Sequence, residues 1–291
     1  SNNGFFEIMS TSLTKESYSK NTENTVFILN PLSQDLNVLR QTLLYSGLEA
    51  INYNKNRRQG DLKLFEFGKS YHKVDGKYIE NQHLALFVTG KKASEHWSGK
   101  QTDIDFFFLK GIIQNLMDRV GKNILKQFTA EYFSSDVFTE GLSFSQKGKT
   151  IVQCGKIKPA ILKTADINQD VYYANINWDL VLASVSKKDI EYKEVSKFPA
   201  VRRDLSMLLD KKIQFSEIEK TAYQTERNLL KEVNLFDVYE GEKIEQGKKS
   251  YAVSFTLLDE AETLTDKRVD KSMERIMENL EKNLGATIRK S

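Results

Sequence analysis

The sequence is poor in residues that cross-link a chain or bind metals. Its 291 residues include one cysteine, Cys154, and three histidines, His72, His83 and His96. A single cysteine excludes a disulfide scaffold, and the histidines have no cysteine or carboxylate at ligand spacing. We therefore predict no metal site, loop or surface positions for the histidines, and a buried apolar position for Cys154. The cysteine usage fits a protein of the reducing cytoplasm.

Long apolar runs are also lacking. No stretch of 18 apolar residues occurs, which excludes a transmembrane helix and argues against a membrane partner. The first residues, Ser1-Asn2-Asn3-Gly4, show no basic and apolar targeting pattern. We expect the chain to be a piece of a longer protein.

The charge shows little excess of either sign. The formal net charge is +3, and residues 195–291 hold 18 basic and 18 acidic side chains. A chain of this balance is a poor non-specific binder of polyanions. Any nucleic-acid site must therefore depend on where the charges lie.

Proline is scarce, and two of the three prolines sit at boundaries. Residues 185–198 are polar and end at Pro199, which is typical of a linker. We predict two domains, residues 1–194 and 195–291, with enough chain to bury a core without cross-links.

The first part mixes short strands with helices. Apolar spacing predicts strands at 26–29, 62–71, 84–89, 128–133, 150–154 and 171–177, and helices at 35–55, 104–120 and 178–184. Many short strands with few long crossovers favour an α+β domain, an antiparallel sheet with helices packed on it.

The second part has a clearer order. We predict strands at 205–209, 232–239, 250–258 and 286–290, and helices at 214–226 and 266–284. Thr263 and Asp266 resemble a capping box for the last helix, which Gly285 ends. The order βαββαβ is that of the ferredoxin-like split motif.

Strand alternation divides the second sheet into two faces. The apolar side chains expected to meet the helices are Leu205, Met207, Leu209, Phe236, Val238, Tyr251, Val253, Phe255 and Ile288. The opposite set is polar, with one aromatic ring: Asp204, Ser206, Asp237, Tyr239, Ser250, Ala252, Ser254, Thr287 and Arg289. This pattern alone fits either a sheet that faces water or a surface for single-stranded RNA.

Several segments resemble the family of bacterial phenylalanyl-tRNA synthetase β subunits. They are Asn30-Pro31-Leu32-Ser33 with Leu39-Arg40-Gln41-Thr42-Leu43-Leu44, Leu64-Phe65-Glu66-Phe67-Gly68-Lys69, Gly155-Lys156-Ile157-Lys158-Pro159, Phe198-Pro199-Ala200-Val201-Arg202-Arg203-Asp204-Leu205, Leu235-Phe236-Asp237-Val238-Tyr239 with Gly241, Lys249-Ser250, and Thr263-Leu264-Thr265-Asp266. The resemblance spans essentially the whole chain. Lys158 departs from the histidine that is usual in the family.

The resemblance implies that residues 1–194 form a class II synthetase-like core without catalytic residues. In the family, the α subunit carries adenylation with ATP and Mg²⁺, and the subunits assemble as an (αβ)2 heterotetramer. The sequence agrees, because no arginine stands beside Glu66 on its strand to hold an ATP phosphate. Glu66 is interpreted as a structural residue. The helices predicted at 35–55 and 104–120 are either partner faces or ordinary core.

The resemblance also implies that residues 195–291 form an anticodon-binding domain for phenylalanine tRNA. By the family pattern, Tyr239 stacks on a base, and Asp237, Ser250 and Ser206 lie beside it. Flanking basic residues, Arg203, Lys249 and Arg289, are predicted to hold phosphate. Because the four family positions fall on the polar face, we favour RNA binding.

Two other functions are kept as alternatives. The chain could be a structural subunit whose open sheet docks a protein without touching the anticodon. It could also be an adenylating enzyme in its own right, which would show amino-acid-dependent ATP–pyrophosphate exchange.

Overall fold

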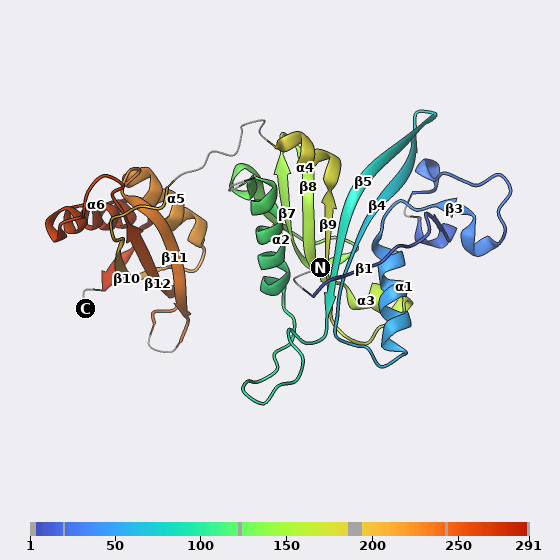
Figure 1. The fold of residues 1–291 in the computed structure, drawn as a ribbon, viewed down its shortest axis with the longest axis horizontal. Helices are drawn as coiled ribbons and strands as arrows, with labels where there is room; N and C mark the ends of the chain where they lie inside the picture. Colours follow the sequence, from blue (N-terminus) through green and yellow to red (C-terminus); the bar gives the residue numbers. More distant parts are fainter. Residues whose placement is uncertain (1–3, 20, 122–123, 186–193, 242–243, 290–291) are drawn as a thin grey trace. The chain divides into compact units, whose positions relative to one another are not determined.

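A computed structural model gives the fold of the chain as two compact units, residues 1–188 and 189–291. It describes all residues except 1–3, 20, 122–123, 186–193, 242–243 and 290–291. Each unit is a sheet with helices packed on it (Figure 1), which confirms the predicted α+β class. The boundary between residues 194 and 195 stays a prediction, since the division between the units falls outside the described residues.

A seven-stranded sheet organises the first unit, in the order β1-β4-β5-β9-β8-β7-β6. Its strands are β1 (Phe6–Glu7), β4 (Leu62–Val74), β5 (Lys77–Thr89), β6 (Thr129–Phe133), β7 (Phe138–Gln146), β8 (Lys149–Ile157) and β9 (Val171–Asn177). Neighbouring strands are antiparallel except that β1 runs parallel to β4. A separate small sheet pairs β2 (Leu13–Thr14) with β3 (Val38–Leu39).

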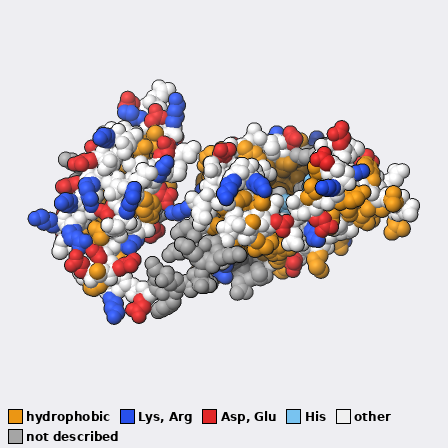
Figure 2. Space-filling view, turned by 90° about the horizontal axis from the view of Figure 1, so that it is seen from above, with side chains coloured by type: hydrophobic (Ala, Val, Ile, Leu, Met, Phe, Trp, Pro, Cys, Tyr) orange, Lys and Arg blue, Asp and Glu red, His pale blue; other side chains and the backbone are white. Residues whose placement is uncertain are grey.

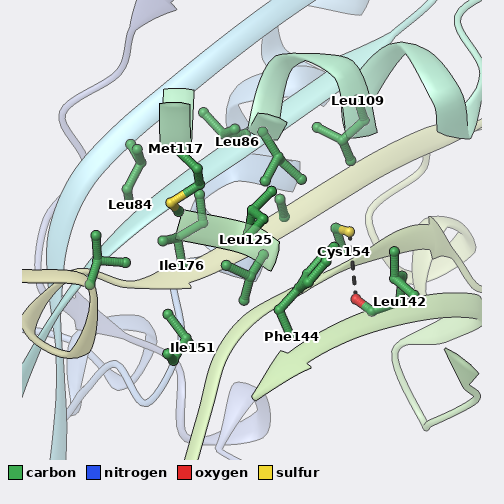
Figure 3. Packing of buried hydrophobic residues seen from close by; sticks show 14 of the residues in the cluster. Leu84, Leu86, Leu109, Met117, Leu125, Leu142, Phe144, Ile151, Cys154 and Ile176 are labelled. Atoms are coloured by element: carbon green, nitrogen blue, oxygen red, sulfur yellow. Dashed lines mark hydrogen bonds between the residues drawn. The ribbon is translucent and has the colours of Figure 1, made fainter. Parts of the chain in front are cut away.

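A hydrophobic core lies on each face of the large sheet. The helices are α1 (Leu44–Lys55), α2 (Phe106–Val120), α3 (Pro159–Thr164) and α4 (Trp178–Ser184), with 3-10 turns η1 (Glu16–Tyr18), η2 (Thr22–Asn24), η3 (Gln34–Leu36) and η4 (Ile124–Gln127). Strand β5 sends Leu84 and Leu86 into the core beneath α2, shown in Figure 3. Its alternate residues, Ala85 and Phe87, join a second core with α1. Leu43, Leu44 and Leu48 of the first expected helix therefore belong to the internal core.

Cys154 lies inside the first of these cores, as predicted. Its side chain is fully buried, and its Sγ donates a hydrogen bond to the Leu142 carbonyl oxygen at 3.5 Å (Figure 3). Burial raises the pKa of the thiol to about 12. A thiol kept protonated in this way is a packing group rather than a nucleophile.

Three expectations for the first unit were wrong. Residues 26–29 form only an isolated bridge from Phe27 to Val38 in place of a strand. The helix expected from residue 35 begins at Leu44, because Val38 and Leu39 pair with β2 instead of continuing a helical stripe. Strand β7 was not predicted, although it pairs with both β6 and β8. Pairing partners distant in sequence overrode local periodicity.

The second unit has the predicted βαββαβ order. Its elements are β10 (Val201–Asp210), α5 (Phe215–Thr225), β11 (Leu230–Tyr239), β12 (Lys248–Leu257), α6 (Asp266–Leu284) and β13 (Thr287–Arg289). The antiparallel sheet has the order β11-β12-β10-β13. This is the ferredoxin-like arrangement predicted from the sequence.

The ends of the two helices only partly follow the prediction. Helix α6 begins after Thr265, which makes no side-chain capping bond, so the expected capping box of Thr263 and Asp266 is wrong. Helix α5 has a capping box instead, formed by Gln214 and Glu217. Gly285 ends α6 in the left-handed conformation, as predicted. No helix in the described part of the chain has the length and apolar character needed to span a bilayer.

Candidate nucleic-acid interface

One face of the C-terminal sheet is covered by α5 and α6, and the other is not. Met207, Val253 and Phe255 point into the core with the helices. Residues paired across antiparallel strands share a face, so the register defines the opposite side. We call it the open face, and it comprises Arg202, Asp204, Ser206, Leu208, Glu232, Asn234, Phe236, Asp237, Tyr239, Ser250, Ala252, Ser254, Thr256, Thr287 and Arg289.

A row of side chains crosses all four strands near the middle of this face. Asp237 of β11 pairs with Ala252 of β12, which pairs with Ser206 of β10, which in turn pairs with Arg289 of β13. Three of the predicted site residues therefore lie in line, with a carboxylate at one end and a guanidinium at the other. Because Ala252 and Ser206 have small side chains, the surface of the sheet lies lower between Asp237 and Arg289.

A second row beside it contains the tyrosine. Tyr239 pairs with Ser250, which pairs with Leu208, which pairs with Thr287. The side chain of Tyr239 is 45% exposed, whereas Ser250 is 9% exposed between its neighbours. The hydroxyl of Ser250 thus forms part of the floor, and the tyrosine ring stands above it.

The position of the Tyr239 ring depends on Gly241. A β-carbon at Gly241 would overlap the hydroxyl oxygen and the ring of Tyr239. Only glycine lets the chain after β11 pass this close to the ring. The glycine of the motif therefore has a local structural role.

Arg203 and Lys249, two predicted phosphate contacts, are not on the open face. Arg203 Nη2 binds Asp266 Oδ1 at 2.9 Å, at the start of α6. Lys249 is only 8% exposed, and its Nζ donates to the Lys211 carbonyl oxygen at 2.9 Å. Each lies two residues from a helix-facing residue, so alternation places it on the helix side. Grouping basic residues by their closeness in sequence missed this.

Two other arginines are on the open face. Arg202 Nε binds Asp204 Oδ1 at 2.8 Å, and this hydrogen bond is the main cause that raises the pKa of Arg202. Arg289 is exposed, and no hydrogen bond or ion pair joins it to another described residue. Arg289 is therefore the predicted cation that remains available on this face.

Phe236 was predicted to meet the helices, and this was wrong. A β-bulge between Leu235 and Asp237 inserts one extra residue into β11. Phe236 is 50% exposed, and its ring centroid lies 5.4 Å from the guanidinium carbon of Arg202 on the open face. The adjacent apolar pair Leu235-Phe236 was the available signal in the sequence. Val238 does lie opposite the helix-facing Tyr251, although it is half-exposed at the sheet edge.

Glu66 in the first unit is a structural residue, as interpreted. Its carboxylate is buried and accepts a hydrogen bond from Arg40 Nη1 at 2.7 Å. Ser10 Oγ donates to the same carboxylate at 2.8 Å, and Arg40 Nε binds the Lys69 carbonyl oxygen at 3.0 Å. The Nε and Nη1 groups of the nearby Arg40 guanidinium therefore have partners within the fold.

A hollow of about 340 Å³ opens on the sheet of the first unit. Its lining comprises Tyr18, Asn21, Asn24, Gln41, Thr42, Leu44, His72, Val137, Phe138, Gln153, Tyr173 and Asn175. These described residues include amides, hydroxyls and rings but neither lysine nor arginine. His72 and His83 lie on this sheet, where desolvation lowers their pKa values and favours neutral imidazoles. Within the described residues, no three potential metal ligands gather.

Comparison with family models matches both units. Residues 1–178 match the family described as "Phenylalanyl tRNA synthetase beta chain CLM domain". Residues 196–289 match the family described as "Ferredoxin-fold anticodon binding domain".

Curated relatives match almost the whole chain. The chain is 47% identical to proteins named phenylalanine–tRNA ligase β subunit from Bacteroides fragilis and Bacteroides thetaiotaomicron, and 36% identical to the one from Porphyromonas gingivalis. Each match covers 98% of this chain and 37% of the relative. The chain thus spans little more than a third of the length of these relatives.

Proposed function

The chain belongs to the phenylalanyl-tRNA synthetase β-chain family, and from this premise we propose that it is the tRNA-binding, subunit-assembling part of a phenylalanine–tRNA ligase. Residues 195–291 recognise the anticodon of phenylalanine tRNA on the open face. The α subunit carries out ATP-dependent aminoacylation. The observation that carries the proposal is the pair of rows that sets Asp237, Ser206 and Arg289 beside Tyr239.

Each side chain of the two rows has a chemical task. The exposed ring of Tyr239 stacks on an unpaired base, a contact worth about 1–3 kcal/mol. The Asp237 carboxylate accepts hydrogen bonds from N–H groups on the edge of that base. The hydroxyls of Ser250 and Ser206, at the low middle of the face, donate to or accept from the same edge.

Phosphate binding on this face rests on Arg289. Its guanidinium is exposed and has no partner among the described residues, so it can pair with a phosphate without first breaking an ion pair. Arg203 and Lys249 would each have to leave an existing partner. We therefore assign the phosphate contact of the open face to Arg289.

Aminoacylation chemistry does not fit the first unit. Holding and activating ATP requires cations that neutralise charge on the phosphates. The described lining of the hollow has neither lysine nor arginine, and Arg40 is occupied by Glu66. ATP and Mg²⁺ are therefore assigned to the α subunit, and no catalytic residue is assigned to this chain.

The first unit instead offers surface for assembly. Leu29 and Leu32 on one loop and Trp97 on another are almost completely exposed. We assign these two loops to contacts with the α subunit and with a second β subunit in an (αβ)2 assembly.

The test is a titration of the chain with phenylalanine tRNA at fixed moderate salt. The control is the same tRNA with a scrambled anticodon, which keeps the charge and length unchanged. Tighter binding of the native anticodon is expected because Asp237, Ser206 and Ser250 face its base edges. Equal binding of the two RNAs would contradict anticodon recognition.

Docking of a protein on the open face is the second candidate, and the partly exposed Leu208 favours it. It predicts that an α-type partner protects the open face from hydrogen exchange while tRNA does not. Independent adenylation has no such support, and ATP–pyrophosphate exchange by the chain alone is expected to be absent.

A further inference from the structure

We propose that Phe236 is a second base-stacking residue of the open face, separate from Tyr239. This inference rests on the proposed function, because it adds a nucleotide position to the same RNA surface. Its starting point is the β-bulge, which turns an aromatic ring from the expected core side to the exposed side.

The bulge decides the direction of the ring. Leu235 pairs with Val253, and Val238 pairs with Tyr251, so both belong to the helix side. Between them the extra residue allows Phe236 and Asp237 to follow each other on the open face. A strand without the bulge would place only one of these two side chains there.

Arg202 contacts the Phe236 ring and is itself held by Asp204. Its guanidinium carbon lies 5.4 Å from the centroid of the Phe236 ring, reaching across β12 from β10. Asp204 holds the guanidinium through two hydrogen bonds, from Nε at 2.8 Å and from Nη2 at 3.3 Å. The ring is therefore supported on one side, and half of its surface stays exposed.

An exposed phenylalanine beside an arginine suits a base better than a specific protein side chain. Every base has a π-face that stacks on an aromatic ring, and arginine adds a cation–π contribution. Ser254 is nearly buried beneath this part of the face, and the Asn234 paired with it is exposed. Because stacking on a ring does not by itself select a base, we infer a base-stacking position at Phe236.

The spacing separates this position from the one at Tyr239. Phe236 and Tyr239 are three residues apart on β11, and because the bulge takes up one of these residues they lie about 7–10 Å apart along the strand. Consecutive bases in a stack lie about 3.4 Å apart. The bases on Phe236 and Tyr239 are therefore not consecutive members of one stack, and the two rings hold different nucleotides.

The experiment uses the full chain and anticodon stem-loops of phenylalanine tRNA that carry 2-aminopurine at one loop position at a time. Stacking on an aromatic ring quenches this base. The two test variants are Phe236→Leu, which keeps an apolar side chain, and Tyr239→Ala. The control is Val238→Ala, because Val238 lies on the same strand but on the helix side of the sheet. Circular dichroism and thermal unfolding verify that each variant is folded.

We expect Phe236→Leu to weaken stem-loop binding by about 5- to 30-fold through loss of stacking. Phe236→Leu should restore 2-aminopurine fluorescence at one loop position, and Tyr239→Ala should restore it at a different loop position. Val238→Ala should change neither the affinity nor the fluorescence. If Tyr239→Ala responds and a folded Phe236→Leu binds like the control, or relieves the same position as Tyr239→Ala, the second position is refuted. If neither aromatic variant changes binding, the proposed function itself fails, and this inference with it.

Discussion

The two units use the same kind of sheet in opposite ways. In the first unit a hydrophobic core lies on each face of the sheet, because alternate residues of β5 enter two different cores. In the second unit the helices cover one face, and polar and aromatic side chains occupy the other. From the side seen in Figure 2, hydrophobic side chains gather over the first unit, and charged side chains are more prominent over the second.

The charged groups of the two units differ in whether they pair with each other. In the first unit, Arg40 and Glu66 form a buried ion pair whose job is internal. On the open face, Asp237 and Arg289 lie at opposite ends of one row. Charged groups that satisfy each other stabilise a fold, and charged groups held apart stay available to a ligand.

The largest effect should come from breaking the buried pair. Glu66→Ala leaves the Arg40 guanidinium buried without its carboxylate, which should cost the first unit about 3–5 kcal/mol of unfolding free energy. Urea unfolding followed by hydrogen exchange should show the loss in residues 4–185 and not in residues 194–289. The control Glu80→Ala removes an exposed pair with Lys69, and we expect no measurable change from it. An unchanged stability of the Glu66→Ala protein would contradict the structural role assigned to Glu66.

A matched pair on β12 tests the assignment of faces in the second unit. Val253 is fully buried under the helices, whereas its neighbour Ala252 faces the opposite side. Val253→Ser should destabilise this unit by about 2–4 kcal/mol through lost packing and a buried hydroxyl. Ala252→Ser should leave the melting temperature almost unchanged. Similar losses in both variants would mean that the face is not open.

The third substitution should change RNA affinity and leave the stability of the fold unchanged. Tyr239→Ala should weaken binding of phenylalanine tRNA by about 1–3 kcal/mol, because the stacking ring is lost. Its half-exposed side chain contributes little to the core, so thermal unfolding should be preserved. Filter binding or fluorescence anisotropy measures the affinity. Unchanged affinity in the folded variant would exclude the stacking role.

The smallest effect distinguishes the available cation from the occupied one. Arg289→Gln should reduce the slope of log affinity against log salt by about 0.7–1, because one phosphate contact disappears. Arg203→Gln is the control, since Arg203 is bound to Asp266 on the helix side. Equal slopes for Arg289→Gln and the unaltered chain would place the phosphate contact elsewhere.

Sequence reasoning succeeded where one element carries its own pattern. The apolar stripe of α6 and the alternation of β10 and β12 are local, and they predicted the order of the second unit. It failed where a distant segment decides, as for Val38 and Leu39, which pair with β2, and for the unpredicted β7. Local periodicity does not report such partners.

The candidate site shows the same division. Asp237, Tyr239, Ser250 and Ser206 were placed on the open face by alternation and family resemblance, and the register gathers them there. Arg203 and Lys249 lie on the helix side of the sheet, which closeness to a strand end did not specify. Phe236 was missed because a single inserted residue reverses parity without changing the composition.

The sequence by itself therefore determined the α+β class, the βαββαβ order and the polar character of one face, since these depend on spacings within single elements. Only the tertiary structure decided which cations are free and which aromatic rings are exposed. Those properties depend on the partner strand, the bulge and the acidic residues that α6 brings to Arg203. An ion pair or a register shift is a relation between segments distant in sequence, and it exists only once they have come together.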